Sequence, residues 1–161
     1  MSGVASGAGA AQSRRRRIRM TPAEEAAFLR DHPKCALATI DQDGFPHVVA
    51  MGFFVDDDGA FCMTSYAKAQ KVLNIRRNPL VGIMVEAGDA YAELQGVMVR
   101  GRCEIIDDTD EVRAAMHHRR RAGPADRDSS SGLDSAPKRV LLRITPLKKT
   151  SWDHKKLGGK Y

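Results

Sequence analysis

Apolar and polar positions near the start of the chain change from helical to strand-like spacing. Residues 21–24 read Thr-Pro-Ala-Glu, which combines a helix N-cap, a proline at the first helical position and a capping box. We therefore expect a short helix that ends near Asp31 and buries Phe28 and Leu29. From Lys34 onward the apolar residues have the β-type pattern, which predicts that a sheet begins there.

The central and late parts of the chain predict a series of strands joined by polar turns. The expected strands are residues 35–40, 45–54, 60–63, 80–86, 91–106 and 138–145. The first two flank the turn 41–44, Asp-Gln-Asp-Gly, which is typical of a hairpin. Gly96 and Gly101 lie inside the longest segment, where glycines indicate bulges or bends.

Two further helices are expected between these strands, and together the elements define the fold class. One helix lies before Pro79, and the other covers about residues 111–120, with Val112, Ala115 and Met116 at helical spacing. Strands and helices do not alternate regularly, and no dinucleotide fingerprint is present, so a doubly wound sheet is excluded. We predict a mainly β fold, a small barrel of about six antiparallel strands with peripheral helices.

The length of 161 residues suits one domain with a sizeable core. Residues 1–19 combine Gly, Ala and Ser with the run Arg14 to Arg17, which predicts a disordered basic tail. Residues 20–161 would form the barrel domain. Within it, segment 122–137 is rich in Gly, Pro, Ser and Asp and is expected to be a flexible loop, with a lid as the alternative.

The formal net charge of +6 is unevenly distributed, with a second arginine run at residues 119–121. Such runs occur in nucleic-acid-binding proteins, but solvated tails carry them more often, and few aromatic residues are present to stack on bases. A basic nucleic-acid-binding module is therefore the less favoured alternative, and no nucleic-acid partner is expected. No long apolar span or leader is evident, so we expect a cytoplasmic protein without a membrane partner.

The residues with reactive side chains do not form a recognisable catalytic or metal-binding pattern. Three cysteines, Cys35, Cys62 and Cys103, have no paired spacing, so we predict small buried hydrophobic residues rather than zinc ligands or disulfides. His117 and His118 are neighbours that point about 100° apart on a helix, which makes a poor joint metal site. No metal is expected, the catalytic residues remain unknown, and the chemistry is expected to come from a cofactor.

Residues 64–79 contain the clearest sign of a binding site. This stretch leaves a strand through hydroxyl residues and then places basic side chains, including Lys68 and Lys71, along a short helix. Free N–H groups at a helix start with lysines nearby suit a phosphate group. A solvated basic helix is the alternative, but Val72 and Ile75 are spaced to fix the helix to the barrel, which favours a phosphate site.

Trp152 is a second candidate, because it lies in a polar segment next to His154 and Lys155. A flat apolar ring beside cations suits a ring-shaped ligand. The alternative is an ordinary aromatic residue that packs in the core or in a dimer interface.

Four segments, taken in their order along the chain, are typical of one known family. They are residues 35–40 (CALATI) with 43–47 (DGFPH), 74–79 (NIRRNP), 94–97 (LQGV) through Gly101, and 151–158 (SWDHKKLG). With them the chain, over about residues 21–159, resembles the flavin- and deazaflavin-binding split β-barrels of the pyridoxamine 5'-phosphate oxidase-like superfamily. Within that superfamily it is most similar to the actinobacterial branch that uses coenzyme F420.

This resemblance implies a homodimer of split barrels with two cofactor sites at the interface and a small-molecule substrate. By similarity, the cofactor phosphate would be held by Met63, Thr64, Ser65, Lys68 and Lys71. The ring would be lined by Val49, Ala50 and Met51, and approached by Gln95. The other subunit would contribute Trp152 and Lys155. The acidic glutamyl tail of F420 would meet Arg76 and Arg77.

One departure from the family pattern favours F420 over FMN. Flavin oxidases of this superfamily usually place an Arg-Lys pair at the phosphate, whereas Gln70 precedes Lys71 here. The resemblance thus implies an F420-dependent oxidoreductase that transfers a hydride to an activated C=C or C=N bond of a small organic molecule, such as a polycyclic or tetrapyrrole-like metabolite. The alternative is an FMN-dependent oxidase or flavin-binding protein. Tyr66 and His154 are the polar candidates for a proton donor.

Overall fold

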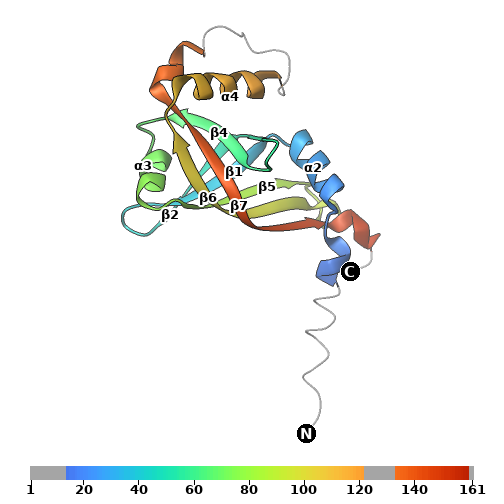
Figure 1. Cartoon of the computed structure of the whole chain (residues 1–161). Coiled ribbons are helices and arrows are strands. Elements are labelled where there is room, and N and C mark those ends of the chain that lie inside the picture. The colour runs from blue at the N-terminus through green and yellow to red at the C-terminus, as the bar shows by residue number, and fades with distance from the viewer. Residues whose placement is uncertain (1–13, 122–132, 160–161) are drawn as a thin grey trace.

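The computed structural model describes residues 14–121 and 133–159, which form one curled antiparallel sheet with helices around it (Figure 1). The strands are β1 (Lys34–Ile40), β2 (Pro46–Gly52), β3 (Phe54–Val55), β4 (Phe61–Tyr66), β5 (Leu80–Ala87), β6 (Gln95–Ile106) and β7 (Arg139–Asp153). Their order in the sheet is β2-β1-β5-β6-β7-β4-β3. The predicted mainly β class, a split barrel with peripheral helices, is confirmed.

The two edge strands of the sheet are consecutive in sequence. Only Phe53 separates β2 from β3, and its backbone N–H donates to the Pro33 carbonyl oxygen at 3.1 Å. Because β2 and β3 stand at opposite ends of the strand order, this short connection draws the edges together and curls the sheet. The predicted strand 45–54 is therefore interrupted at Phe53, whose side chain is buried, and the sheet has seven strands rather than six.

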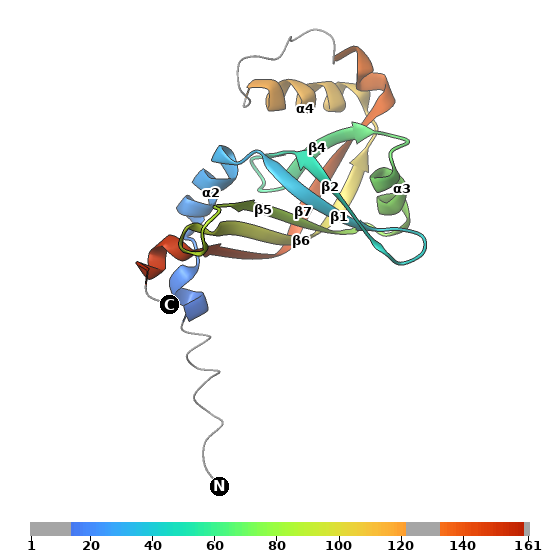
Figure 2. The same ribbon diagram turned by 180° about the vertical axis from the view of Figure 1, so that it is seen from behind.

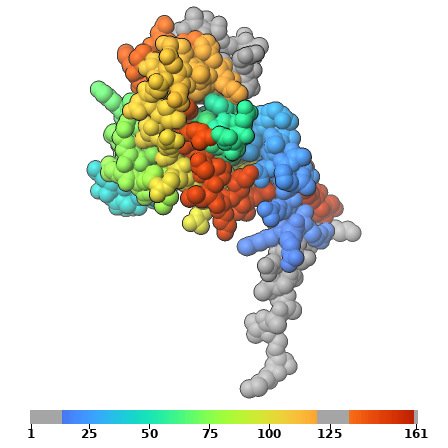
Figure 3. All heavy atoms as spheres, viewed as in Figure 1, coloured from blue at the N-terminus to red at the C-terminus, as the bar shows by residue number. Residues whose placement is uncertain are grey.

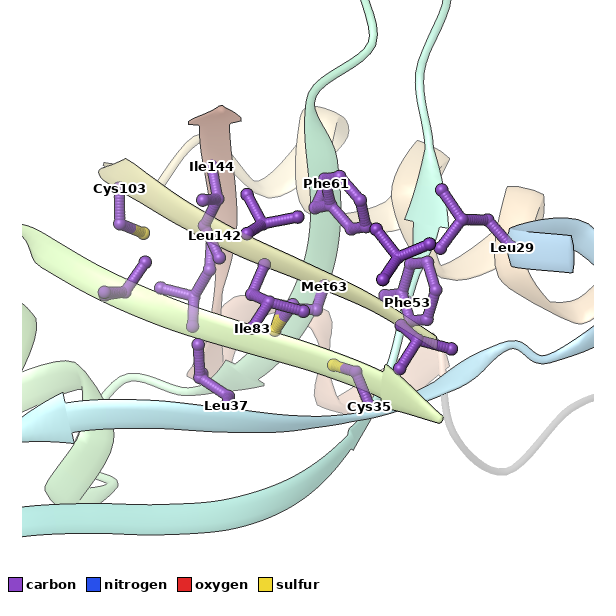
Figure 4. Close-up of a cluster of buried hydrophobic side chains, with 14 of the residues drawn as sticks. Leu29, Cys35, Leu37, Phe53, Phe61, Met63, Ile83, Cys103, Leu142 and Ile144 are labelled. Carbon is purple, nitrogen blue, oxygen red and sulfur yellow. The ribbon is translucent and has the colours of Figure 1, made fainter. Parts of the chain in front are cut away.

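Alternate side chains of the strands fill the inside of the curled sheet. Figure 4 shows Leu37, Met63, Ile83, Leu142 and Ile144 gathered between strands β1, β4, β5 and β7, and each is at most 1% exposed. Strand β1 follows the expected alternation, since every second residue from its second position is buried. This inward alternation is the physical basis on which the strands could be predicted.

All three cysteines are buried and free, as predicted. Burial is the main reason that the pKa of Cys35, Cys62 and Cys103 rises to about 12 in each case. Thiols with such a pKa stay protonated near neutral pH and are poor nucleophiles. The cysteines therefore serve as small apolar residues.

Helices α2 (Pro22–Asp31), α3 (Gln70–Arg77) and α4 (Thr109–Arg121) lie around the sheet, as seen from both sides in Figures 1 and 2. The predicted capping box is present in α2, where the Thr21 hydroxyl accepts from the Glu24 N–H and the Glu24 carboxylate accepts from the Thr21 N–H. Helix α4 covers a second apolar cluster that includes Val112, Met116 and Leu141. No helix in the described residues is long and apolar enough to cross a membrane.

The predicted tail and loop lie partly outside the described residues. From the tail, residues 14–18 are helical and the arginines at 14–17 are exposed, whereas residues 1–13 lie outside. From the loop, residues 122–132 lie outside. Its last part belongs to the 3-10 helix η2 (Leu133–Lys138), in which Ala136 is fully buried in the cluster that α4 covers.

The C-terminal part differs from the prediction in two places. The predicted strand 91–106 begins only at Gln95, because Tyr91–Glu93 forms the 3-10 helix η1. The last strand was predicted to end near residue 145, but β7 continues to Asp153 alongside β6, with a register shift between Arg100 and Gly101. Pairing with β6 satisfies the backbone of this polar segment, so its local composition does not decide its structure.

Candidate functional site

Strand β4 and the start of α3 bring a hydroxyl and an amine together. The Lys71 Nζ donates to the Ser65 Oγ at 3.3 Å. Ala69 occupies the N-cap position of α3 and offers no capping side chain, so the first amides of the helix have no side-chain acceptor from that residue. The predicted phosphate-binding residues Ser65 and Lys71 therefore lie together where the helix begins, whereas Lys68 is exposed nearby.

Arg139 adds a second cation to this group and was not predicted. It is the first residue of β7 and pairs in register with Tyr66, and its guanidinium carbon lies 4.1 Å from the centre of the Tyr66 ring. Its Nε donates to the Ser135 Oγ at 2.9 Å. The sequence alone places Arg139 on an alternating strand, and only the pairing of β4 with β7, which are far apart in sequence, places it beside the start of α3. We call Ser65, Lys71 and Arg139 the anion cluster.

The anion cluster is electrostatically uncompensated. Burial, and then the positive charge of Arg139, lower the pKa of Lys71. Within residues 14–121 and 133–159, no carboxylate forms an ion pair with Lys71 or Arg139. An anionic group bound here would offset both effects, since it would restore the favourable environment of the ammonium ion.

The two arginines at the end of α3 have contacts within the chain. The Arg77 Nη2 donates to the Asn74 Oδ1 at 2.7 Å. Arg76 lies 4.0 Å from the Asp107 carboxylate, and both side chains are largely exposed. The structure therefore does not place either arginine in contact with the anion cluster.

Asn74 fixes α3 to the sheet and was not predicted as important. It is fully buried, its Nδ2 donates to the Thr39 Oγ1 at 3.0 Å, and its Oδ1 accepts from the Gln70 Nε2 at 2.8 Å. The available signal was a polar residue between Val72 and Ile75 on the buried side of the helix. The position of Lys71 therefore depends on a buried polar network as well as on apolar packing.

Replacement of Asn74 by leucine is expected to destabilise the protein by about 2–4 kcal/mol, because buried donors and acceptors lose their partners. The free energy of unfolding from urea denaturation measures this loss. Leu73→Ala, at a partly exposed position of the same helix, is the control and is expected to change stability far less. Equal losses in both variants would contradict the assigned role.

A second cluster lies at the other end of β7. Trp152 pairs in register with Gly96, and a Cβ atom on Gly96 would lie 2.2 Å from the Trp152 ring, so only glycine leaves room for the indole. The Lys155 Nζ donates to the Gln95 Oε1 at 3.2 Å. The structure thus brings together Gln95, Trp152 and Lys155, which we call the tryptophan cluster.

His154 extends the tryptophan cluster toward η1. Its ring stands edge-on to Tyr91 at 4.6 Å, and its Nδ1 lies 2.9 Å from the Tyr91 carbonyl oxygen. Because a carbonyl can only accept, Nδ1 carries a proton, and Nε2 of the neutral ring is then an acceptor. His154 is therefore held in one tautomer.

The remaining predicted residues have side chains in different environments. Met63 is fully buried in the core, and Thr64 is also buried. On edge strand β2, Val49 and Met51 pack against the core, whereas Ala50 is exposed. A ligand on the outer side of β2 would thus meet the Ala50 side chain and the strand backbone rather than the other two side chains.

The anion cluster and the tryptophan cluster are separated within one chain. They lie at opposite ends of β7, and 13 residue steps from Arg139 to Trp152 correspond to roughly 40 Å of strand path. Figures 1 and 2 agree that α3 and the red C-terminal segment after β7 lie at opposite ends of the folded part of the chain. A single chain therefore does not assemble all the predicted site residues.

The outer face of the sheet carries apolar and small residues across neighbouring strands. Ala36 pairs with Ala50 on one side and with Met84 on the other, and Met84 pairs with Met98. Both methionines are more than 40% exposed, and Val48 is exposed on the same face of β2. An exposed apolar surface of this kind is typical of an interface between protein chains.

The sequence profile of pyridoxamine 5'-phosphate oxidase matches residues 21–153, nearly the whole described chain. The chain belongs to the pyridoxamine 5'-phosphate oxidase family. This confirms the family that the sequence motifs indicated. No functionally curated protein matches the chain.

Solved structures of similar proteins agree with this family and differ in what they are named for. A conserved hypothetical protein, Rv2991 from Mycobacterium tuberculosis, is 36% identical, with 89% of this chain and 91% of that one covered at a TM-score of 0.80. A structure named F420 reductase is 28% identical, covers 77% and 94%, and has a TM-score of 0.62. The haem storage protein HutZ from Vibrio cholerae, at 16% identity, coverage of 82% and 93% and a TM-score of 0.64, shares the fold.

Proposed function

We propose that this member of the pyridoxamine 5'-phosphate oxidase family is a cytoplasmic oxidoreductase that uses coenzyme F420 to transfer a hydride to an activated C=C or C=N bond of a small organic substrate. The observation that carries the proposal is the anion cluster, in which two cations and a hydroxyl meet at the start of α3 without a carboxylate partner among the described residues. The cluster suits a phosphate group of a cofactor. The similarity to an F420 reductase and the residue Gln70 support a deazaflavin.

We propose that the active form is a homodimer in which each site combines the anion cluster of one subunit with the tryptophan cluster of the other. Two observations support this arrangement. The two clusters lie at opposite ends of β7, and the outer sheet face offers an apolar surface for a second copy. In a two-fold dimer both sites would be equivalent.

The residues of the two clusters fit the chemical parts of such a cofactor. Lys71, Arg139 and Ser65 would bind the phosphate, and the indole of Trp152 from the partner subunit would cover a flat ring and exclude water from it. The Gln95 amide and Lys155 offer hydrogen-bond donors to ring or side-chain oxygens. When bound, F420 supplies the hydride, so these side chains would act by positioning and by shielding the site from water.

Two side chains are proposed to handle the proton that accompanies hydride transfer. Tyr66 is half exposed beside the anion cluster, with the Arg139 guanidinium carbon 4.1 Å from the centre of its ring, and its phenolic hydroxyl is a hydrogen-bond donor. His154 has its Nδ1 occupied, so its Nε2 can accept a proton or, in the charged ring, donate one. Single-turnover rates of Tyr66→Phe and His154→Gln would show which of the two contributes.

Titration of the purified protein with F420 and with FMN, followed by fluorescence, tests the cofactor assignment. We expect tighter binding of F420, and oxidation of reduced F420 by one or more members of a panel of conjugated enones and imines. Tighter binding of FMN would instead favour a flavin-dependent oxidase of the same fold.

The affinity for F420 is expected to fall as the pH rises. The fall should begin at a lower pH than it would if the pKa of Lys71 had the usual value for lysine. The folded protein lowers the pKa of Lys71 below its usual 10.5, so its charge is present below this lowered pKa and is lost as pH rises through it. Dissociation constants measured between about pH 7 and 10 should therefore rise, and Lys71→Arg should flatten the profile because arginine stays charged. An unchanged profile in that variant would contradict the assignment.

A further inference from the structure

A cleft outside both clusters is large enough for a second ligand. It has a volume of about 680 Å³ and lies between α2, the segment before it, β3 and the outer part of β7, with His118 of α4 at its border. This volume is within the usual range for small-molecule sites. In Figure 3 the segments around α2, β3 and α4 border the same face of the molecule. No residue of the anion cluster or the tryptophan cluster lines it.

The floor of the cleft is apolar and partly aromatic. Its lining includes Met20, Leu29, Phe53, Phe54 and Phe61. Four of these are mostly buried, and Phe54 also stacks on the His118 ring at 4.3 Å. The apolar part of a ligand that packs on this floor is removed from water, which favours its binding.

The walls of the cleft are fixed by contacts between segments distant in sequence. The Met20 backbone N–H donates to the buried Ser151 Oγ at 3.2 Å, which joins the segment before α2 to β7. On the same side, Lys149 of β7 forms an ion pair with Glu25 of α2. These contacts fix α2 and the segment before it against β7, so this side of the cleft is formed by folded structure without a ligand.

The rim of the cleft has an excess of positive charge. Among the described residues that line the cleft, Glu25 is the only acidic one, and Lys149 neutralises it. Arg19 and Arg30 also line the cleft and are exposed, and no carboxylate of the described residues pairs with either. Arg19 precedes α2 and Arg30 lies near the C-terminal end of α2, so the two arginines border the cleft at different places. Either guanidinium together with the apolar floor complements a molecule that is apolar at one end and anionic at the other.

We propose that this cleft binds a hydrophobic carboxylate, with its carbon body against the phenylalanine floor and its carboxylate at the rim that carries Arg19 and Arg30. The positive rim favours binding of this ligand over an uncharged apolar molecule. The apolar floor favours it over a small inorganic anion. The site is separate from the proposed cofactor site, so it can be tested independently.

Calorimetric titration of the full chain with decanoate tests the proposal, with decanol as the uncharged counterpart. We expect saturable decanoate binding that is about tenfold or more tighter than binding of decanol, because a charge-assisted contact contributes in one case only. The double variant Arg19→Glu, Arg30→Glu should lose at least this factor for decanoate. Arg16→Glu, an exposed position outside the lining, should bind like the wild type.

A tryptophan placed in the cleft should block it without disturbing the core. Ala26 lines the cleft at an exposed position of α2, whereas Ala23 is exposed on the same helix outside the lining. We expect Ala26→Trp to lose decanoate binding and to keep F420 binding, and Ala23→Trp to keep both. Absence of saturable decanoate binding by the wild type, or equal binding by Ala26→Trp, would overturn the proposal whatever the cofactor proves to be.

Discussion

Removal of either cation of the anion cluster is expected to weaken F420 binding by about 10- to 100-fold, because each charge-assisted contact to a phosphate contributes about 1.5–3 kcal/mol. Lys71→Ala removes the ammonium ion that donates to Ser65, and Arg139→Ala removes the neighbouring guanidinium. The loss should be larger than for Arg76 and Arg77, since these two arginines lie at the other end of α3.

Fluorescence titration of F420 against both variants measures this effect, and Arg76→Ala is the matched control. Arg76 is exposed near Asp107 and away from the anion cluster, so its loss should change the affinity by less than about threefold. Arg139→Lys should recover part of the affinity, because it keeps the charge but loses the planar geometry. Similar losses in Arg76→Ala and Lys71→Ala would instead indicate binding along the whole helix.

The barrel could be predicted from the sequence because its strands alternate inward and outward over most of their length. Leu37, Ile83 and Leu142 are regularly spaced apolar residues, and all are fully or almost fully buried. The start of α2 could be predicted for a similar local reason, since Thr21 and Glu24 satisfy each other's backbone groups. Elements that are decided by interactions between residues close in sequence can therefore be predicted from the sequence alone.

The parts that could not be predicted depend on contacts between distant segments. Arg139 joins the anion cluster only because β7 pairs with β4, and Trp152 lies on a strand only because β7 continues along β6. The break at Phe53 likewise follows from closure of the sheet, since its apolar neighbours suggest one continuous strand. The role of Asn74 could not be predicted for the same reason, because its hydrogen-bond partner, the Thr39 hydroxyl, lies in another element.

The separation of the two clusters leads to the second large expected effect, which is complementation between two defective variants. Lys71→Ala should damage the anion cluster of its own chain, and Trp152→Ala should remove the indole that this chain contributes to its partner's site. Each variant alone is expected to form dimers without high-affinity F420 sites. When equal amounts are unfolded together and refolded, about half of the dimers should contain one chain of each kind.

Each mixed dimer would contain one intact site, made from the wild-type anion cluster of the Trp152→Ala chain and the wild-type indole of the Lys71→Ala chain. Titration should therefore recover about a quarter of the high-affinity sites of the wild type, whereas the separately refolded variants recover none. If both residues served a site within one chain, every mixed dimer would contain two damaged sites and mixing would recover nothing. Size-exclusion chromatography of the same samples distinguishes that outcome from a failure to form dimers, because it shows directly whether the refolded chains have associated.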